Sequence, residues 1–160
     1  MDKEYEYTII VDSLEPYFRY CRENGFTLTE KCEQTRTIYR NPNKTMARIT
    51  INKTLDGHEK KQLDFKEDNL VEGQVLKEVK ESQSIDFTDD KAVESILEFL
   101  DYKKDNSMTR VRTVYEIEGA KFEIDEYITP KQANVVSVEG NDQKKVDKIF
   151  NEITKLDNQK

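Results

Sequence analysis

Like-charged residues placed two positions apart on predicted strands constrain the fold of this chain most strongly. Three such pairs occur: Glu4 with Glu6, Arg110 with Arg112, and Glu123 with Asp125. Successive side chains of a strand point to opposite faces of a sheet, so both members of each pair share a face. Like charges on one face cost free energy unless an opposite charge lies between them. Each pair therefore requires a partner of opposite sign, from a neighbouring strand or from a ligand.

Two arrangements meet this requirement. In the first, the charged faces point to solvent and neighbouring strands offset the charges, which is common on protein surfaces. In the second, antiparallel strands close around a polar interior and helices cover the apolar exterior. The acidic pairs would then hold a divalent metal through oxygen ligands, and the arginines would hold a polyanion bridged to it. The residues alone leave both arrangements open.

Strand and helix patterns follow the same order twice along the chain. One strand, one helix and three further strands are predicted in each half, and another helix follows. The predicted strands are 4–11, 28–39, 46–51 and 61–66, then 75–84, 109–117, 120–128 and 134–139. The predicted helices run from a cap at Asp12-Ser13 to Asn24, from a cap at Asp89-Asp90 to Leu100, and over 143–156. The second helix is expected to turn Val93, Ile96, Leu97 and Leu100 inward.

Length and composition favour one folded domain covering residues 1–160. Charged residues (37%) slightly outnumber hydrophobic ones (35%), but 8 Tyr and 7 Phe supply aromatic side chains that disordered chains rarely carry. A net charge of -7 argues against a nucleic-acid partner. No apolar run approaches the ~20 residues that span a membrane, and the first residues lack the pattern of a secretion signal. We therefore expect a cytoplasmic protein that does not bind membranes.

Several common chemistries lack the residues they need. Cys21 and Cys32 form no Cys-x-x-Cys pair, so a zinc or redox site is not expected. His58 is the only histidine and lies in a predicted turn beside Gly57, which disfavours histidine-dependent nucleophilic catalysis. The five glycines are scattered, so they form no glycine-rich phosphate-binding loop.

The charged strands resemble those of the CYTH superfamily, also called triphosphate tunnel metalloenzymes. That family opens on Glu-x-Glu-x-Lys, and this chain begins its first strand with Glu4-Tyr5-Glu6-Tyr7-Thr8. Further matches in the family's order are Gly25-Phe26, Gln34 to Tyr39, Arg48-Ile49-Thr50, Lys66, Arg110-Val111-Arg112, Glu123-Ile124-Asp125 and Ser137-Val138-Glu139. The resemblance covers residues 4–155, and the order and intervals of the motifs are more specific than any one motif.

The resemblance implies an α+β fold: an eight-stranded antiparallel β-barrel with about three helices packed outside. It implies metal-side carboxylates at Glu4, Glu6, Glu139 and Asp125, and phosphate-binding residues at Arg48, Lys66, Arg110 and Arg112. The implied cofactor is Mg²⁺ or Mn²⁺, which suits a site of oxygen ligands. The implied activity is hydrolysis of a small-molecule triphosphate: inorganic, nucleoside or thiamine triphosphate. Alternatives are a non-catalytic polyphosphate- or nucleotide-binding module and a class IV-like adenylate cyclase.

Three positions depart from the family pattern. Thr8 replaces the lysine of the first motif, Thr50 replaces an arginine, and Ser137 replaces a glutamate. A hydrogen bond to a charged partner is worth roughly 1.5–3 kcal/mol, so each missing cation is expected to weaken phosphate binding about 10- to 100-fold. The pattern thus fits an enzyme of altered specificity or a binding protein without catalysis. The sequence leaves open which triphosphate fits, whether a homodimer forms, and what the acidic segment Glu67–Glu72 does.

Overall fold

The computed structural model describes residues 2–67 and 77–156. Its helices are α1 (Glu15–Glu23), α2 (Asp90–Phe99) and α3 (Gln143–Ile153). Its strands are β1 (Asp2–Val11), β2 (Thr27–Arg40), β3 (Thr45–Thr54), β4 (Glu59–Glu67), β5 (Lys77–Glu81), β6 (Ile85–Asp86), β7 (Lys103–Ile117), β8 (Ala120–Thr129) and β9 (Ala133–Gly140).

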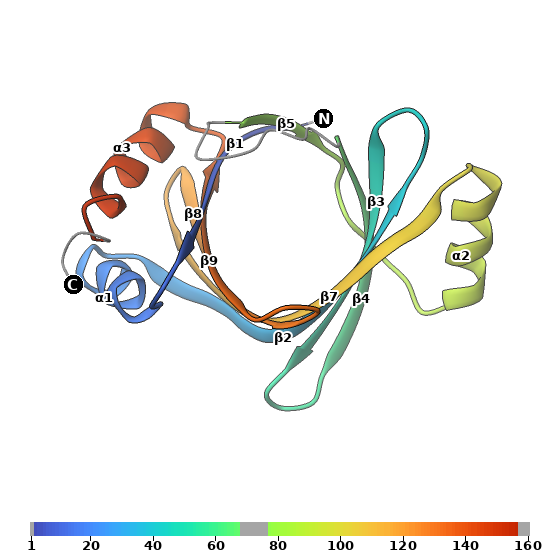
Figure 1. Ribbon diagram of the computed structural model, residues 1–160, viewed down its shortest axis with the longest axis horizontal. Helices are drawn as coiled ribbons and strands as arrows, with labels where there is room; N and C mark the ends of the chain where they lie inside the picture. The colour runs from blue at the N-terminus through green and yellow to red at the C-terminus, as the bar shows by residue number, and fades with distance from the viewer. Residues whose placement is uncertain (1, 68–76, 157–160) are drawn as a thin grey trace.

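Eight of these strands form a closed ring, which Figure 1 shows from one end. The strands pair in the order β3-β2-β7-β8-β9-β1-β5-β4, and β4 pairs with β3 to complete the circuit. All pairings are antiparallel, and the shortest joins β4 to β5 with Lys66 opposite Glu81. The two-residue strand β6 pairs with β4 outside the ring. The eight-stranded antiparallel barrel predicted from the sequence is confirmed.

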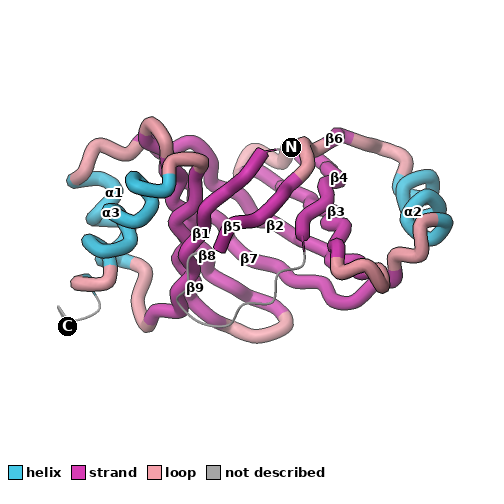
Figure 2. The backbone as a smooth tube through the Cα atoms, turned by 90° about the horizontal axis from the view of Figure 1, so that it is seen from above, coloured by secondary structure: helices cyan, strands magenta, loops and turns pink. Residues whose placement is uncertain are grey.

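Three helices lie outside the barrel on opposite sides (Figures 1 and 2). Helices α1 and α3 cover the side formed by β1, β8 and β9, where Phe122, Val136 and Val138 are almost fully buried. The ring of Tyr7 on β1 stacks on Phe150 of α3 with centroids 4.0 Å apart. The main hydrophobic core therefore lies between the outer face of the barrel and the helices, and leaves the inner face to polar residues.

Helix α2 covers the other side with a narrower apolar stripe than the sequence predicts. Val93 and Leu97 are buried against Ala47 of β3 and Leu63 of β4. Ile96 and Leu100 were expected to face inward as well, but they are 54% and 48% exposed. A single helix resting on two strands buries only the residues along its line of contact, so its flanking apolar positions stay in solvent.

The ends of several elements differ from the sequence predictions. Helix α1 has Leu14 at its N-cap position without a side-chain cap, so the predicted cap at Asp12-Ser13 is wrong. Strand β7 begins at Lys103 rather than near 109, because the polar residues at its start pair with Tyr39 and Arg40 of β2. The predicted strand 75–84 corresponds to the shorter β5, with 75 and 76 outside the described residues, and the two-residue strand β6 follows after its predicted end. In the segment Glu67–Glu72, only Glu67 is described, at the end of β4. None of the helices in the described ranges has the length and apolar character to span a membrane.

Candidate functional site

Polar side chains line a cavity of about 320 Å³ inside the barrel, which is partly open to solvent. Among the described residues that line it, Val135 alone lacks a polar side-chain atom. The alternation of the strands produces this separation: on β8, Glu123 and Asp125 face the cavity while Phe122 and Ile124 belong to the outer core. Of the two arrangements left open by the sequence, the structure has the closed barrel with a polar interior.

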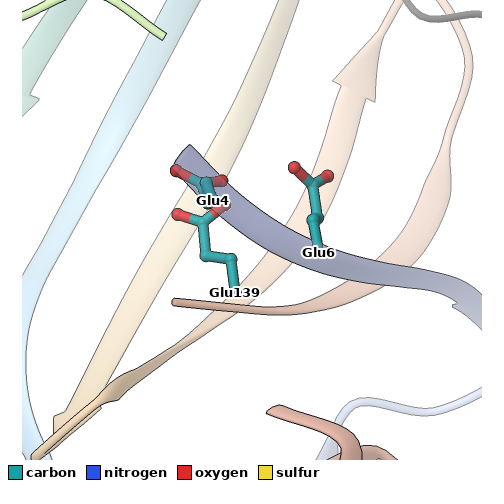
Figure 3. A group of neighbouring side chains, drawn as sticks. All are labelled: Glu4, Glu6 and Glu139. Carbon is teal, nitrogen blue, oxygen red and sulfur yellow. The ribbon is translucent and has the colours of Figure 1, made fainter. Parts of the chain in front are cut away.

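Three carboxylates from two neighbouring strands meet at one place in the wall (Figure 3). Glu4 and Glu6 lie two positions apart on β1, and Glu139 on β9 is the register partner of Glu6. One carboxylate oxygen from each of the three lies within 4.8 Å of the others. We call Glu4, Glu6 and Glu139 the carboxylate cluster. Three of the four metal-side residues predicted from the sequence thus come together.

The carboxylate cluster is short of positive charge. Lys66 Nζ lies 3.1 Å from Glu6 Oε2, and Lys121 Nζ lies 3.0 Å from Glu139 Oε1. In contrast, Glu4 Oε1 is buried without a hydrogen-bond partner among the described residues. Burial, together with a hydrogen bond to Glu139 and repulsion from it, raises the pKa of Glu4 to about 11. The neutral form of Glu4 is therefore favoured while no cation is bound, and a bound cation would offset the repulsion between Glu4 and Glu139.

Asp125 lies apart from this cluster, in a network with two arginines. Its oxygens accept hydrogen bonds from Arg112 Nε and Nη2, both at 2.8 Å, and Arg110 Nη1 is 3.6 Å away. Glu123 Oε2 lies 2.6 Å from Arg112 Nη1 on the other side. Two carboxylates thus neutralise Arg112, and the structure places Asp125 as a partner of arginine.

The four predicted phosphate-binding residues all line the cavity, but they differ in how free their charges are. Arg48 is held by Asp64, with a 2.9 Å bond from Nε to Oδ1, and also donates to Glu81. These carboxylates outweigh the effect of burial and hold the pKa of Arg48 above its ordinary value. Arg48 and Arg112 are therefore already paired, and Lys66 is shared with Glu6.

Arg110 is less fully neutralised than Arg48 and Arg112. Its Nε donates to Gln34 Oε1 at 2.8 Å, and its Nη1 donates to the hydroxyl of Tyr127. Its guanidinium carbon also lies 5.3 Å from the centre of the Tyr127 ring. Asp125, the nearest carboxylate, is at the outer limit of an ion pair and is already bound by Arg112.

Arg36 was not predicted as a site residue, yet it is the least neutralised cation in the cavity wall. Its Nε donates to Thr50 Oγ1 at 3.1 Å, and no carboxylate oxygen of the described residues lies within 4.0 Å of it. Burial, with repulsion from Arg48, Arg110 and Arg112, lowers its pKa to about 9. The alternation after Gln34 could have placed Arg36 on the inner face, because the two residues share that face of β2.

The three departures from the family pattern occupy related places. Thr8 on β1 and Ser137 on β9 are register partners, and their hydroxyl oxygens lie 3.0 Å apart. The resemblance implies a lysine and a glutamate at these positions, so a pair of opposite charges is replaced by a pair of hydroxyls. Thr50 instead accepts the hydrogen bond from Arg36. The first two replacements leave the net charge of the cavity unchanged, which limits their effect on anion binding.

Comparisons with known proteins identify the fold but no sequence family. No family model and no curated protein sequence matches the chain. The PH1012 protein from Pyrococcus horikoshii OT3 is similar in structure, with a TM-score of 0.69 and 16% identity over 95% of this chain and 88% of that chain. HpAC1 from Hippeastrum, an adenylyl cyclase candidate with a dominant triphosphatase activity, has a TM-score of 0.67 and 15% identity over 97% of this chain and 88% of its own.

A third similar structure is a chain of the Schizosaccharomyces pombe Mediator head module. It has a TM-score of 0.63 and 10% identity, over 96% of this chain and 94% of that chain. At such identities, structural likeness carries information on the fold alone. The closed barrel and these neighbours together show that the chain shares the fold of these solved structures, a closed antiparallel barrel as the resemblance to the CYTH superfamily implied.

Proposed function

We propose that this protein binds a short triphosphate together with Mg²⁺ or Mn²⁺ inside the barrel and hydrolyses it. One observation carries the proposal: Glu6 and Glu139 of the carboxylate cluster line the same cavity as Arg36, and among the described residues Glu4 Oε1 of that cluster has no hydrogen-bond partner and Arg36 has no carboxylate partner. In a metal complex of a polyanion, the metal ion would neutralise the carboxylate cluster and the polyanion would neutralise Arg36.

The residues of the carboxylate cluster fit a hard divalent cation. Carboxylate oxygens are the ligands that Mg²⁺ and Mn²⁺ prefer, and the buried Oε1 of Glu4 accepts no hydrogen bond from the described residues, so it can serve as a metal ligand. Glu4, Glu6 and Glu139 would hold the ion, which would supply charge neutralisation of the phosphates. Asp125 is not included because both of its oxygens are bound by Arg112.

Arg36 and Arg110 are the residues best placed to bind phosphate oxygens. Arg36 donates to the hydroxyl of Thr50, and Arg110 donates to the amide oxygen of Gln34. Hydrogen bonds from these arginines to a charged phosphate oxygen would be stronger than these bonds to neutral oxygens. Contacts made by buried side chains such as Arg110 are stronger than the same contacts in bulk water. Hydrolysis would follow from fixing the phosphate chain while water attacks the terminal phosphorus and its bond to the bridging oxygen breaks.

A second candidate, binding without catalysis, is favoured by a specific observation. Thr8 and Ser137 bond to each other where the family resemblance implies charged side chains. A site that has lost two charged groups can still hold an anion through its arginines and yet fail to stabilise the charge that develops during bond breaking.

A product assay on the purified protein separates these functions. Tripolyphosphate, ATP and thiamine triphosphate are each supplied with Mg²⁺, with Mn²⁺, or with EDTA, and orthophosphate, pyrophosphate and cyclic AMP are measured. We expect metal-dependent release of orthophosphate, lost in the Glu4→Gln/Glu6→Gln double variant. A saturating ligand at 100 times its dissociation constant should also raise the melting temperature by about 5–10 °C.

The other outcomes of this assay have distinct meanings. Thermal stabilisation without any product supports the non-catalytic module, and cyclic AMP with pyrophosphate supports a cyclase. Neither stabilisation nor turnover with any of the three triphosphates would overturn the proposal.

A further inference from the structure

Glu6 is held in the carboxylate cluster by residues outside that cluster. Figure 3 shows the carboxylates of Glu4 and Glu139 together, with the carboxylate of Glu6 standing apart from them. Glu6 and Glu139 are register partners on neighbouring strands, where like charges repel each other. The place of Glu6 beside the other two carboxylates therefore depends on groups of another kind.

Two donors hold Glu6, one at each oxygen of its carboxylate. Lys66 Nζ lies 3.1 Å from Oε2, and the hydroxyl of Thr8 donates to Oε1 at 3.0 Å. Thr8 follows Glu6 by two positions on β1, so both side chains face the barrel interior. A hydrogen bond from a hydroxyl to a carboxylate is charge-assisted and stronger than one between neutral groups. Thr8 therefore fixes the oxygen that Lys66 leaves free.

Ser137 completes a chain of hydroxyl hydrogen bonds that ends on Glu6. It lies on β9 as the register partner of Thr8, and the two hydroxyl oxygens are 3.0 Å apart. Each hydroxyl has a single proton to donate. Because Thr8 gives its proton to Glu6, the hydrogen bond between the two hydroxyls uses the proton of Ser137. Both hydroxyls thus point toward Glu6, and each donation strengthens the next.

The surroundings of this chain leave it little freedom to rearrange. The side chain of Thr8 is β-branched, which restricts its rotation about χ1. Ser137 is only 8% exposed, and its register partner on β8 is Glu123. That glutamate is already paired with Arg112 at 2.6 Å. Thr8 is the one hydrogen-bond partner that the hydroxyl of Ser137 has among the described residues.

We infer that Thr8 and Ser137 are positioning residues for the metal site. Ser137 orients Thr8, Thr8 orients the carboxylate of Glu6, and Glu6 is thereby held where the three carboxylates of the cluster can share one cation. Hydrogen bonds made to a metal ligand from behind raise metal affinity, because the ligand is already ordered when the ion binds. The inference rests on the proposed function, since it requires a cation at the carboxylate cluster. It gives a role to two residues at which this chain departs from the family pattern.

Titration calorimetry of the purified protein with Mn²⁺ alone tests the inference without any turnover. Thr8→Val keeps the shape of the side chain but removes the hydroxyl, and is expected to weaken Mn²⁺ binding about 10-fold or more. Thr8→Ser keeps the hydroxyl and should stay within about threefold of the wild type. Ser137→Ala removes only the support of Thr8, so it should weaken Mn²⁺ binding measurably but less than Thr8→Val does.

The double variant Thr8→Val/Ser137→Ala distinguishes a chain from two independent effects. A residue that acts only through Thr8 has nothing left to orient once the Thr8 hydroxyl is gone. The double variant should therefore bind Mn²⁺ as tightly as Thr8→Val does. Weakening equal to the product of the two single fold-changes would overturn the inference.

A second pair of hydroxyls in the same sheet supplies the matched control. Thr37 on β2 and Ser107 on β7 are register partners with hydroxyl oxygens 3.3 Å apart, in an exposed place. Thr37→Val removes one hydroxyl of this pair and should change Mn²⁺ binding less than about twofold. An effect of Thr37→Val as large as that of Thr8→Val would show a general disturbance of the sheet and overturn the inference.

Failure of the inference and failure of the proposed metal site give different results. Wild-type Mn²⁺ binding by Thr8→Val, together with weak binding by Glu4→Gln, would overturn the inference alone. If Thr8→Val does not fold, wild-type Mn²⁺ binding by Ser137→Ala has the same meaning. A wild-type protein that binds no Mn²⁺, or whose Mn²⁺ binding survives Glu4→Gln unchanged, would overturn the proposed metal site itself.

Discussion

Replacing Glu4 by glutamine is expected to lower metal-dependent hydrolysis by at least about 100-fold without destabilising the protein. The change removes one oxygen ligand and its charge from the carboxylate cluster, and losses of this size follow removal of one group that stabilises developing charge. We expect the protein to keep its shape because the raised pKa of Glu4 favours the neutral form of this side chain when no metal is bound. Glutamine is close to that neutral carboxylic acid in size and hydrogen bonding. Steady-state phosphate release with Mn²⁺ and calorimetric Mn²⁺ binding measure the two parts of the effect.

The stability of the Glu4→Gln variant has a definite sign. Folding raises the pKa of Glu4 from its ordinary value of 4.5, so the folded state binds more protons than the unfolded state above about pH 4.5. Glu4 therefore lowers the free energy of unfolding of the metal-free wild type as pH rises from 4.5 through 7. At pH 7 the variant should melt at the same temperature as the wild type or higher.

A matched change on the outside of the barrel provides the control. Glu126 is an exposed glutamate on β8, so Glu126→Gln should leave both Mn²⁺ binding and hydrolysis unchanged. Hydrolysis by Glu4→Gln within threefold of the wild type would contradict the assignment of the carboxylate cluster.

Replacing Arg36 by glutamine is expected to weaken triphosphate binding about 10- to 100-fold while leaving the free energy of unfolding unchanged or increased. Arg36 has no carboxylate partner among the described residues and is repelled by three other arginines. Its removal therefore relieves repulsion in the empty barrel and takes away a free cation that an anion would use. Calorimetric titration with tripolyphosphate and urea denaturation measure the two effects.

Arg112 provides the contrasting variant, because its charge is fully paired. Arg112→Gln leaves Asp125 and Glu123 buried without their cation, which is expected to lower the free energy of unfolding by about 3–5 kcal/mol. Function and stability should thus separate: Arg36 matters chiefly for the ligand, and Arg112 chiefly for the barrel. Tripolyphosphate binding by Arg36→Gln that equals the wild type would show that the free cation is not an anion site.

The architecture was predictable because it depends on patterns within single strands and helices. Alternation along β1 places Glu6 and Tyr7 on opposite faces, and the structure agrees: Glu6 lines the cavity and Tyr7 packs against the outer core. Helix α2 shows the limit of such reasoning. Its apolar positions fit two helix faces equally well, and only packing on β3 and β4 selects Val93 over Ile96.

The partners of the charged residues could not be predicted in the same way. The pairing of Glu6 with Glu139 and of Arg112 with Asp125 depends on the register between strands, which single-strand patterns do not give. Asp125 has the residue type and spacing of a metal ligand, but its register partner on β7 is Arg112, and the two form an ion pair. Arg36 has no like-charged residue two positions away, so the signal used for the other cations did not find it.

Manganese itself tests the central claim most directly, since it scatters anomalously at accessible X-ray wavelengths. Crystals grown with Mn²⁺ and tripolyphosphate should show an anomalous peak bounded by Glu4, Glu6 and Glu139, with phosphate density running from it toward Arg36 and Arg110. A manganese peak on the outer surface, or phosphate density only outside the barrel, would contradict the account.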